Sequence, residues 1–224
     1  MSQINSTRSG CKDVFKAFLV ENAIYDGFLE IPVINHGIYK PKKLISFSKS
    51  ISSTDYDSWG HFYEDDVTFE RIWNNPKKYL SILQKYECVI CPDFSLYRDM
   101  PLVMQLWNIY RSRALGNWLQ SNGINVIANV RFGDSRTFKA CCFGIPQNST
   151  IAIGTHGCIK LLEDRSYTAS GIEYVVEHLK PQRIVVYGTA PAYIFDNVKA
   201  KGIEILQFDS DYSISRKGDY HGSR

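Results

Sequence analysis

Short apolar runs rich in β-branched residues alternate with longer stretches of helical period along most of the chain. Gly, Pro or Asn bounds the short runs, which favours buried strands over fragments of helices. Two further apolar runs, 28–34 and 44–47, precede the alternating part and have no helical stretch between them. The strand candidates of the alternating part are 59–63, 88–91, 125–130, 150–154, 183–187 and 203–208.

The stretches between these strands predict helices at 67–86, 101–121, 135–142, 166–180 and 191–201. The first should break at Asn75-Pro76, because Asn75 can cap a new helix that has Pro76 in its first position. The second has the clearest period, and its apolar residues predict one buried stripe of Val103, Trp107, Tyr110, Ala114 and Trp118. Arg111 and Arg113 could reach the strand ends from this helix, but its solvated face is the expected place for them.

Alternation of strands and helices implies parallel strands joined by helical crossovers. Eight strands would suit a small β/α barrel, although 224 residues is near the lower end for that fold. Because the first two candidates lack an intervening helix, the sequence predicts an α/β fold with a small or incomplete TIM-like barrel. The alternative is an open, doubly wound parallel sheet. One domain over residues 1–224 is expected, with a loose N-terminal segment at 1–27 and a polar tail at 210–224.

Composition and charge are those of an ordinary soluble globular protein. Hydrophobic residues make up 44% and charged residues 22%, and a net charge of +3 is too weak to indicate a polyanionic partner by itself. The N-terminal residues contain no apolar signal core, and no apolar run approaches the roughly 20 residues that span a bilayer. We therefore expect a cytoplasmic protein without membrane association.

Six cysteines are too few for a disulfide scaffold in a chain of this length. Cys88 and Cys91 have the spacing of a metal-binding pair, but they fall on a predicted strand, where side chains three apart point to opposite faces. Cys141 and Cys142 are adjacent, and no second CxxC pair exists. Reduced, packed thiols are expected, with no metal or other cofactor.

Charged and polar side chains gather where the predicted strands end. In a parallel β/α fold, the loops at the carboxyl ends of the strands converge and form the ligand site. The segments that precede the strands carry mostly Lys, Asn, Gln, Ser and Gly. The residues that follow the strands include Glu64, Asp65, Asp66, Asp93, Ser95, Tyr97, Asp99, Arg131, Asp134, Arg136, Thr155, His156, Thr189, Asp209 and Asp211. This asymmetry predicts a polar site of mixed charge at one rim of the sheet.

The aspartates of this rim divide into two groups. Asp66, Asp99 and Asp134 each stand where a helix begins, and Asp is a favoured N-cap worth about 1 kcal/mol, so capping is their expected role. Asp93 follows a strand directly, several residues before the next helix, and no cap explains it. We therefore expect Asp93 to be a site residue.

Arg131 and His156 each have a structural and a functional interpretation. Arg131 ends an apolar strand and needs an anionic partner or solvent, so it could pair with Asp93, with Asp134 or with a bound anion. His156 lies in a turn between glycines, where backbone amides can approach a phosphate or carboxylate. His61, inside a strand, is expected to be packed. The chain has no GxGxxG, P-loop, GxSxG or HExxH motif.

A series of motifs follows the strand candidates along the chain. They are His61-Phe-Tyr-Glu-Asp-Asp66, Phe69-Glu-Arg-Ile-Trp-Asn-Asn-Pro76, Pro92-Asp-Phe-Ser-Leu-Tyr97, Asp99-Met-Pro101, Trp107-Asn-Ile-Tyr-Arg-Ser-Arg113, Arg131-Phe-Gly-Asp134, Arg136-Thr137 and Ile153-Gly-Thr-His-Gly157. Over roughly residues 32–211, they resemble an uncharacterised family of bacteria, phages and mobile elements, the domain-of-unknown-function family 4417. The resemblance implies a cytoplasmic protein, often encoded by phages or integrated elements, with a shared site at the rim. It implies no particular activity.

We expect an enzyme, or a pocket derived from one, that binds a small anionic ligand at this rim. In the setting that the resemblance implies, the ligand would be a nucleotide, a nucleoside or a nucleic acid. In glycosidic-bond cleavage, Asp93 and Asp134 would divide the roles of acid and nucleophile. The substrate would be bound by Arg131, Arg136, Ser95, Tyr97, Thr155, His156 and Asp65.

Two alternatives stay open. In metal-assisted phosphoester hydrolysis, Asp65, Asp93 and Asp134 would bind Mg²⁺ or Mn²⁺ through oxygen ligands, although no Asp-x-Asp pair or histidine set fixes a metal. A non-catalytic accessory protein would instead hold nucleic acid or a host protein. The 14 tyrosines and 4 tryptophans would permit base stacking in that case.

Overall fold

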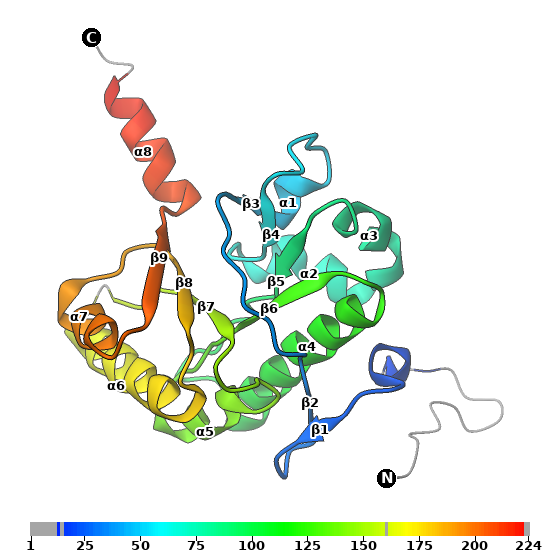
Figure 1. Cartoon of the computed structure of the whole chain (residues 1–224), viewed down its shortest axis with the longest axis horizontal. Helices are drawn as coiled ribbons and strands as arrows, with labels where there is room; N and C mark the ends of the chain where they lie inside the picture. Colours follow the sequence, from blue (N-terminus) through cyan, green and yellow to red (C-terminus); the bar gives the residue numbers. More distant parts are fainter. Residues whose placement is uncertain (1–12, 14–15, 160, 222–224) are drawn as a thin grey trace.

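The computed structural model describes residues 13, 16–159 and 161–221, and shows a parallel sheet curled into a half-barrel (Figure 1). Its seven strands follow one another across the sheet in chain order, and every neighbouring pair is parallel. The incomplete barrel is thus confirmed, and the doubly wound alternative, whose strand order reverses within the sheet, is not the fold. The strands are β3 (Leu44–Ser46), β4 (Trp59–His61), β5 (Cys88–Ile90), β6 (Asn125–Asn129), β7 (Thr150–Gly154), β8 (Arg183–Tyr187) and β9 (Glu204–Phe208).

Helices connect these strands and cover the outer, convex side of the half-barrel (Figure 1). The predicted break at Asn75 is confirmed, because one helix ends at Asn74 and the next begins at Pro76. The helices are α1 (Phe47–Ser50), α2 (Asp66–Asn74), α3 (Pro76–Leu83), α4 (Leu102–Ser121), α5 (Ser135–Cys142), α6 (Leu162–Leu179), α7 (Ala192–Ala200) and α8 (Asp211–His221).

Side chains of the strands alternate between the two sides of the sheet. On the concave side, a small apolar cluster fills the half-barrel with Trp59, Cys88, Ile90, Ile127, Ala152 and Val185. On the convex side, apolar strand residues such as Val89, Val126 and Ile184 join the main core under the helices. Cys88 belongs to the first cluster and Cys91 to the second, which confirms that the two thiols lie on opposite sides of the sheet.

The apolar run 28–34 does not form a barrel strand, so that prediction was wrong. Within it only β2 (Ile31–Pro32) is extended, and it pairs antiparallel with β1 (Tyr25–Asp26) in a separate two-stranded sheet. Pro32 has no N–H to donate to a ladder, which makes it unsuited to a central strand. The pair packs outside the barrel, where Ile34 donates its backbone N–H to the carbonyl of Gly144 at 2.8 Å.

The segments expected to be loose contain folded elements. A 3₁₀ turn, η1 (Ala17–Val20), lies within 1–27, and its Leu19 and Val20 are buried in the main core. Residues 1–12 and 14–15 lie outside the described part of the chain. Within 210–224, α8 forms a helix that stands away from the half-barrel in Figure 1.

Helix α4 is buried differently from the predicted stripe. Val103 and Trp107 near its N-terminus are 72% and 44% exposed, whereas both of its central arginines are buried. Arg113 is only 1% exposed and donates to the backbone carbonyls of Asn129 at 2.8 Å and Cys141 at 2.9 Å. Arg111 forms an ion pair with Glu70 beside α2. The prediction that these arginines cover a solvated face was wrong, because backbone carbonyls hold Arg113 and the Glu70 carboxylate pairs with Arg111 inside the fold.

Candidate functional site

Asp93 occupies the rim at the carboxyl ends of the strands, directly after β5. It is 8% exposed, and the amide Nδ2 of Asn129, at the end of β6, donates to its Oδ1 at 2.7 Å. The Nε atom of Arg131 lies 3.6 Å from the same oxygen. Tyr63 completes the arrangement, since its hydroxyl donates to Oδ1 of Asn129 at 2.9 Å. The ends of β4, β5 and β6 thus bring together the Asp93 carboxyl group and the hydrogen-bond donors around it.

The second carboxyl oxygen of Asp93 is in a different position. No hydrogen bond reaches Oδ2 from any residue that the structure describes. Gly154, the last residue of β7, lies beside this oxygen, since a Cβ atom there would be in ordinary contact with Oδ2 at 3.5 Å and would clash with the Tyr63 ring at 2.8 Å. The carboxyl group is therefore held by one oxygen and left available at the other.

Burial raises the pKa of Asp93, and the nearby Asp66 carboxylate adds to this increase. The guanidinium of Arg131 and the hydrogen bond from Asn129 oppose it without cancelling it. Burial alone would lower the pKa of Arg131, but Asp93 and then Cys158 outweigh that effect, and the arginine stays charged. A fixed positive charge therefore stands beside a carboxyl group that retains its proton more readily than usual.

Arg131 holds Asp93 and still presents part of its guanidinium to the rim. Its Nη1 donates to the carbonyl of Gly154 at 3.3 Å and to Sγ of Cys158 at 3.0 Å. Its side chain is 20% exposed, and Nη2 has no hydrogen bond from the described residues. Pairing with Asp93, one of the alternatives predicted for this arginine, is confirmed.

Asp134 lies on the same rim but in a separate ion pair. It caps α5 by accepting from the backbone N–H of Arg136 at 3.0 Å, which confirms its predicted capping role. Both carboxylate oxygens also accept from the Arg136 guanidinium, at 2.9 and 2.8 Å. Arg136 in turn donates to the carbonyl of Arg98 at 2.7 Å. The side-chain hydrogen bond from Arg136 to Asp134 lowers the pKa of Asp134. No direct contact among the described residues joins Asp134 to Asp93.

The capping interpretation was wrong for Asp66 and Asp99. Asp66 is inside the first turn of α2, and its carboxylate accepts from the backbone N–H and the hydroxyl of Ser95, the latter at 2.8 Å. Asp99 lies ahead of α4, whose N-cap position is Pro101. Asp66 therefore connects α2 to the loop after β5, and Ser95 is the residue of that loop that donates to its carboxylate.

The other predicted ligand-binding residues are dispersed along the rim. The Tyr97 ring is 61% exposed, and Asp65 stands at the N-cap position of α2 without a side-chain cap bond. Thr155 is fully buried and donates to the carbonyl of Thr189 at 2.7 Å, so it supports the loop after β7. His156 lies against Tyr212 of α8, with ring centroids 5.7 Å apart.

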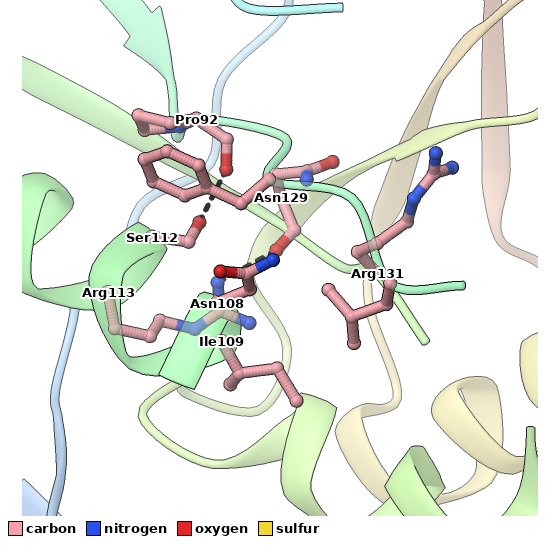
Figure 2. Close-up of a pocket in the computed structure, with 9 residues that line it drawn as sticks. Pro92, Asn108, Ile109, Ser112, Arg113, Asn129 and Arg131 are labelled. Atoms are coloured by element: carbon pink, nitrogen blue, oxygen red, sulfur yellow. Dashed lines mark hydrogen bonds between the residues drawn. The ribbon is translucent and has the colours of Figure 1, made fainter. Parts of the chain in front are cut away.

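A small cavity lies beneath the rim, between the loop after β5 and α4 (Figure 2). It has about 10 Å³ of space, close to the minimum that one ordered water needs. Figure 2 shows Arg113 directed at the backbone of Asn129, while the Arg131 side chain extends away from Arg113. A nucleotide cannot enter a space of this size.

His61 is packed inside the mouth of the half-barrel, as predicted. It is 1% exposed, its Nδ1 accepts from the backbone N–H of Tyr63 at 3.1 Å, and its ring lies 4.6 Å from that of Tyr187. Burial lowers the pKa of His61 to about 4, although Asp211 partly opposes this. Tyr187 also stacks on Tyr63 at 4.7 Å, so aromatic rings support the phenol that holds Asn129.

Sequence reasoning missed Tyr63, Asn129 and Cys158 as members of this site. A signal existed for the first two, because the period of two in a strand places them on the same face as Trp59 and Ile127. Cys158 gave no signal, since its contact with Arg131 depends on the path of a loop.

Metal-ligating side chains do not gather at the rim. Across residues 13, 16–159 and 161–221, no three His, Cys, Asp or Glu side chains are placed to hold one ion, so Asp65, Asp93 and Asp134 do not form such a set. Within the same residues, no helix has the length and apolar character needed to cross a bilayer.

Phage proteins resemble this chain over 128 residues. The Gene 1 protein of Mycobacterium phage L5 is 38% identical over 57% of this chain and 56% of its own length, and that of Mycobacterium phage D29 is 36% identical over 57% and 47%. The chain thus spans about half the length of these curated relatives. No solved structure matches it. The sequence profile described as "Domain of unknown function (DUF4417)" matches residues 23–209, and the chain therefore belongs to this family, as its motifs indicate.

Proposed function

We propose that this phage-type protein acts on a nucleoside or nucleotide at the strand-exit rim, with Asp93 as the proton donor in glycosidic-bond cleavage. The observation that carries the proposal is the carboxyl group of Asp93, which is held at Oδ1 and available at Oδ2. A general acid must hold its proton near neutral pH and must face the leaving group. Burial raises the pKa of Asp93, and the donors at Oδ1 leave Oδ2 as the oxygen that carries the proton.

Arg131 supplies the recognition of a negative charge. Its guanidinium is fixed by Asp93, Gly154 and Cys158, and its Nη2 is left for a phosphate or carboxylate at the rim. A guanidinium binds such groups with good geometry because its donors lie in one plane. The exposed ring of Tyr97 offers a surface on which a base can stack.

Asp134 supplies the second carboxylate of the proposed reaction. Arg136 lowers the pKa of Asp134 while burial raises that of Asp93, and a pair of carboxyl groups with opposite shifts can divide acid and nucleophile roles. Arg136 covers both oxygens of Asp134. An anionic group on the ligand would draw Arg136 away and leave this carboxylate free to react. Asp65 and His156 would complete the contacts with the ligand.

The proposal is tested by incubating the full chain with a panel of nucleosides and nucleotides. Base release is measured by chromatography, and binding by the ligand-induced rise in Tm. Asp93→Asn is expected to lower the rate of base release by about 100-fold or more and to keep the rise in Tm. Asp196→Asn, which changes an exposed carboxylate on α7, is the matched control and should keep the wild-type rate.

The other outcomes of this experiment are equally informative. Base release that survives Asp93→Asn in a folded protein would remove the acid role from Asp93. Phosphoester cleavage that a chelator abolishes would replace the proposal with metal-assisted hydrolysis. Binding to the rim without turnover of any compound would replace it with a non-catalytic accessory role.

A further inference from the structure

Positively charged side chains gather on the surface formed by α2 and α3. Residues 71–86 include Arg71, Lys77, Lys78 and Lys85 and no acidic residue, and all four of these side chains are exposed. Lys16 joins them, because its ammonium donates to the backbone carbonyl of the last residue of α2 at 3.1 Å. We call these five residues the basic face. Figure 1 shows α3 on the outer side of the fold.

The cations of the basic face have aromatic rather than acidic partners in the part of the chain that the structure describes. Within the residues that the structure describes, none of its five cations forms an ion pair with Asp or Glu. Aromatic rings are their neighbours instead: Nζ of Lys77 lies 4.6 Å from the centroid of Phe18, and Nζ of Lys85 lies 5.5 Å from that of Tyr56. A ring steadies a cation without cancelling its charge. The positive potential of this surface therefore extends into solvent.

The rest of this surface consists of neutral hydrogen-bonding groups. Within residues 71–86 the other strongly exposed side chains are Asn74, Asn75, Ser81 and Gln84, which are all neutral and polar. Amide and hydroxyl side chains contact phosphate and sugar oxygens in protein–nucleic acid complexes. A membrane-binding helix would need exposed apolar residues to insert among lipids, and residues 71–86 present none, since the exposed Val67 lies at the other end of α2.

The small net charge of the whole chain hides an uneven distribution of charge between the basic face and the rest of the molecule. The chain carries a net +3 and the basic face +5, so the rest of the chain carries −2. The outer surface of α6 illustrates the difference, since Glu163, Glu173 and Glu177 are exposed there. A polyanion approaching the protein would be directed toward α2 and α3.

We propose that the basic face binds the phosphate backbone of a nucleic acid strand without reading its sequence. The cations supply the electrostatic attraction, and the neutral side chains between them supply hydrogen bonds to phosphate and sugar. This surface is separate from Asp93 and Arg131, so the proposal goes beyond the proposed function of the rim and stands without it.

The test measures the binding of a fluorescein-labelled oligothymidine to the full chain by fluorescence anisotropy. Affinity for the wild-type protein should fall steeply between about 50 and 200 mM salt. The triple variant Lys77→Gln, Lys78→Gln, Lys85→Gln should bind more than 10-fold more weakly. Its slope of log affinity against log salt should be smaller by about 2, because each lost contact with a single strand removes about 0.7.

The matched control is Lys139→Gln, Lys199→Gln, Lys201→Gln, which removes three exposed lysines from α5 and the end of α7. It should keep the wild-type affinity and slope. Equal losses in the two triple variants would overturn the proposal, because general charge would then explain the binding. Failure of the wild-type protein to bind at low salt, or tighter binding to phosphatidylserine vesicles than to DNA, would overturn it too. The Asp93→Asn variant should still bind the oligothymidine, because Asp93 is not part of the basic face. Failure of the proposal for the basic face can therefore be distinguished from failure of the proposal for the rim.

Discussion

Two carboxylate–guanidinium pairs lie on the same rim and differ in almost every physical respect. Asp93 is buried and Arg131 is partly buried, with Nε and Oδ1 3.6 Å apart, and Asn129 anchors the carboxyl group. Asp134 and Arg136 are two residues apart in the chain, and the arginine is 46% exposed in its side chain. The pKa of Asp93 is raised and that of Asp134 is lowered. An arginine partner therefore does not by itself decide the protonation state of an aspartate.

Burial explains the opposite shifts. Water stabilises a carboxylate that remains partly exposed, so the added hydrogen bonds from Arg136 lower the pKa of Asp134 further. Asp93 has lost that solvation, and an arginine at 3.6 Å returns only part of it. The Asp134–Arg136 pair is a local helix cap, whereas the Asp93–Arg131 pair exists only because β5, β6 and β7 meet. Chemistry that needs a protonated acid is thus better supported at Asp93.

Arg131→Met should have the largest effect on this comparison. It leaves Asp93 buried without its guanidinium and should lower the free energy of unfolding by about 3 kcal/mol near neutral pH. The pKa of Asp93 in the folded variant then rises further above its unfolded value. The loss should therefore be greatest above the folded pKa of the variant and should shrink as the pH falls below the folded pKa of the wild type, where Asp93 is protonated in both folded proteins. Urea unfolding at several pH values measures this.

Arg136→Met is the control for that experiment. Removing this arginine should cost much less stability, because Asp134 keeps its solvent and the backbone N–H that it caps. A loss at Arg131 that is equal at about pH 3.5 and pH 7.5 would contradict the assignment of Asp93 as a buried group with a raised pKa.

His61 extends the comparison to a buried base. Burial lowers its pKa to about 4 from an ordinary value of 6.5, so the unfolded chain binds a proton between these values that the folded chain does not. The free energy of unfolding should therefore fall as the pH decreases from about 6.5 to 4, by up to about 3 kcal/mol from this residue. His61→Asn keeps an acceptor for the Tyr63 amide and should remove this part of the pH dependence. If the free energy of unfolding depends on pH in the same way for the wild type and His61→Asn between these pH values, the lowered pKa of His61 is refuted.

Much of the fold follows from periodicity along the chain. The strands 150–154 and 183–187 and the helix 135–142 have the predicted bounds, because β-branched runs and clear stop residues define them. The run 28–34 was misjudged, since local pattern does not tell whether an apolar segment pairs inside or outside a barrel. Arg113 was misjudged for a related reason. Its partners are backbone carbonyls of β6 and α5, which only the folded chain brings to it.

The candidate site was predictable in outline only. Strand direction places Asp93, Arg131 and Asp134 on one rim, and the structure agrees with that placement. Which carboxylate meets which guanidinium depends on the twist of the sheet and on loop paths. Asp66 shows the same limit, because its position at a helix start indicated a cap while its carboxylate binds Ser95 across the fold.

Asp134→Ala should have the smallest effect. It removes the cap of α5, which should lower the free energy of unfolding by about 1 kcal/mol. Asp134→Asn should cost less, because an asparagine oxygen can still accept from the Arg136 amide. The pKa of Asp134 is lowered in the folded chain, so the difference between wild type and the alanine variant should be constant above about pH 5 and decrease as the pH falls through the folded pKa. Urea titrations of the three proteins provide the measurement. An alanine variant that loses as much stability as Arg131→Met would mean that the exposed pair is not a simple cap, and the contrast between the two pairs would then fail.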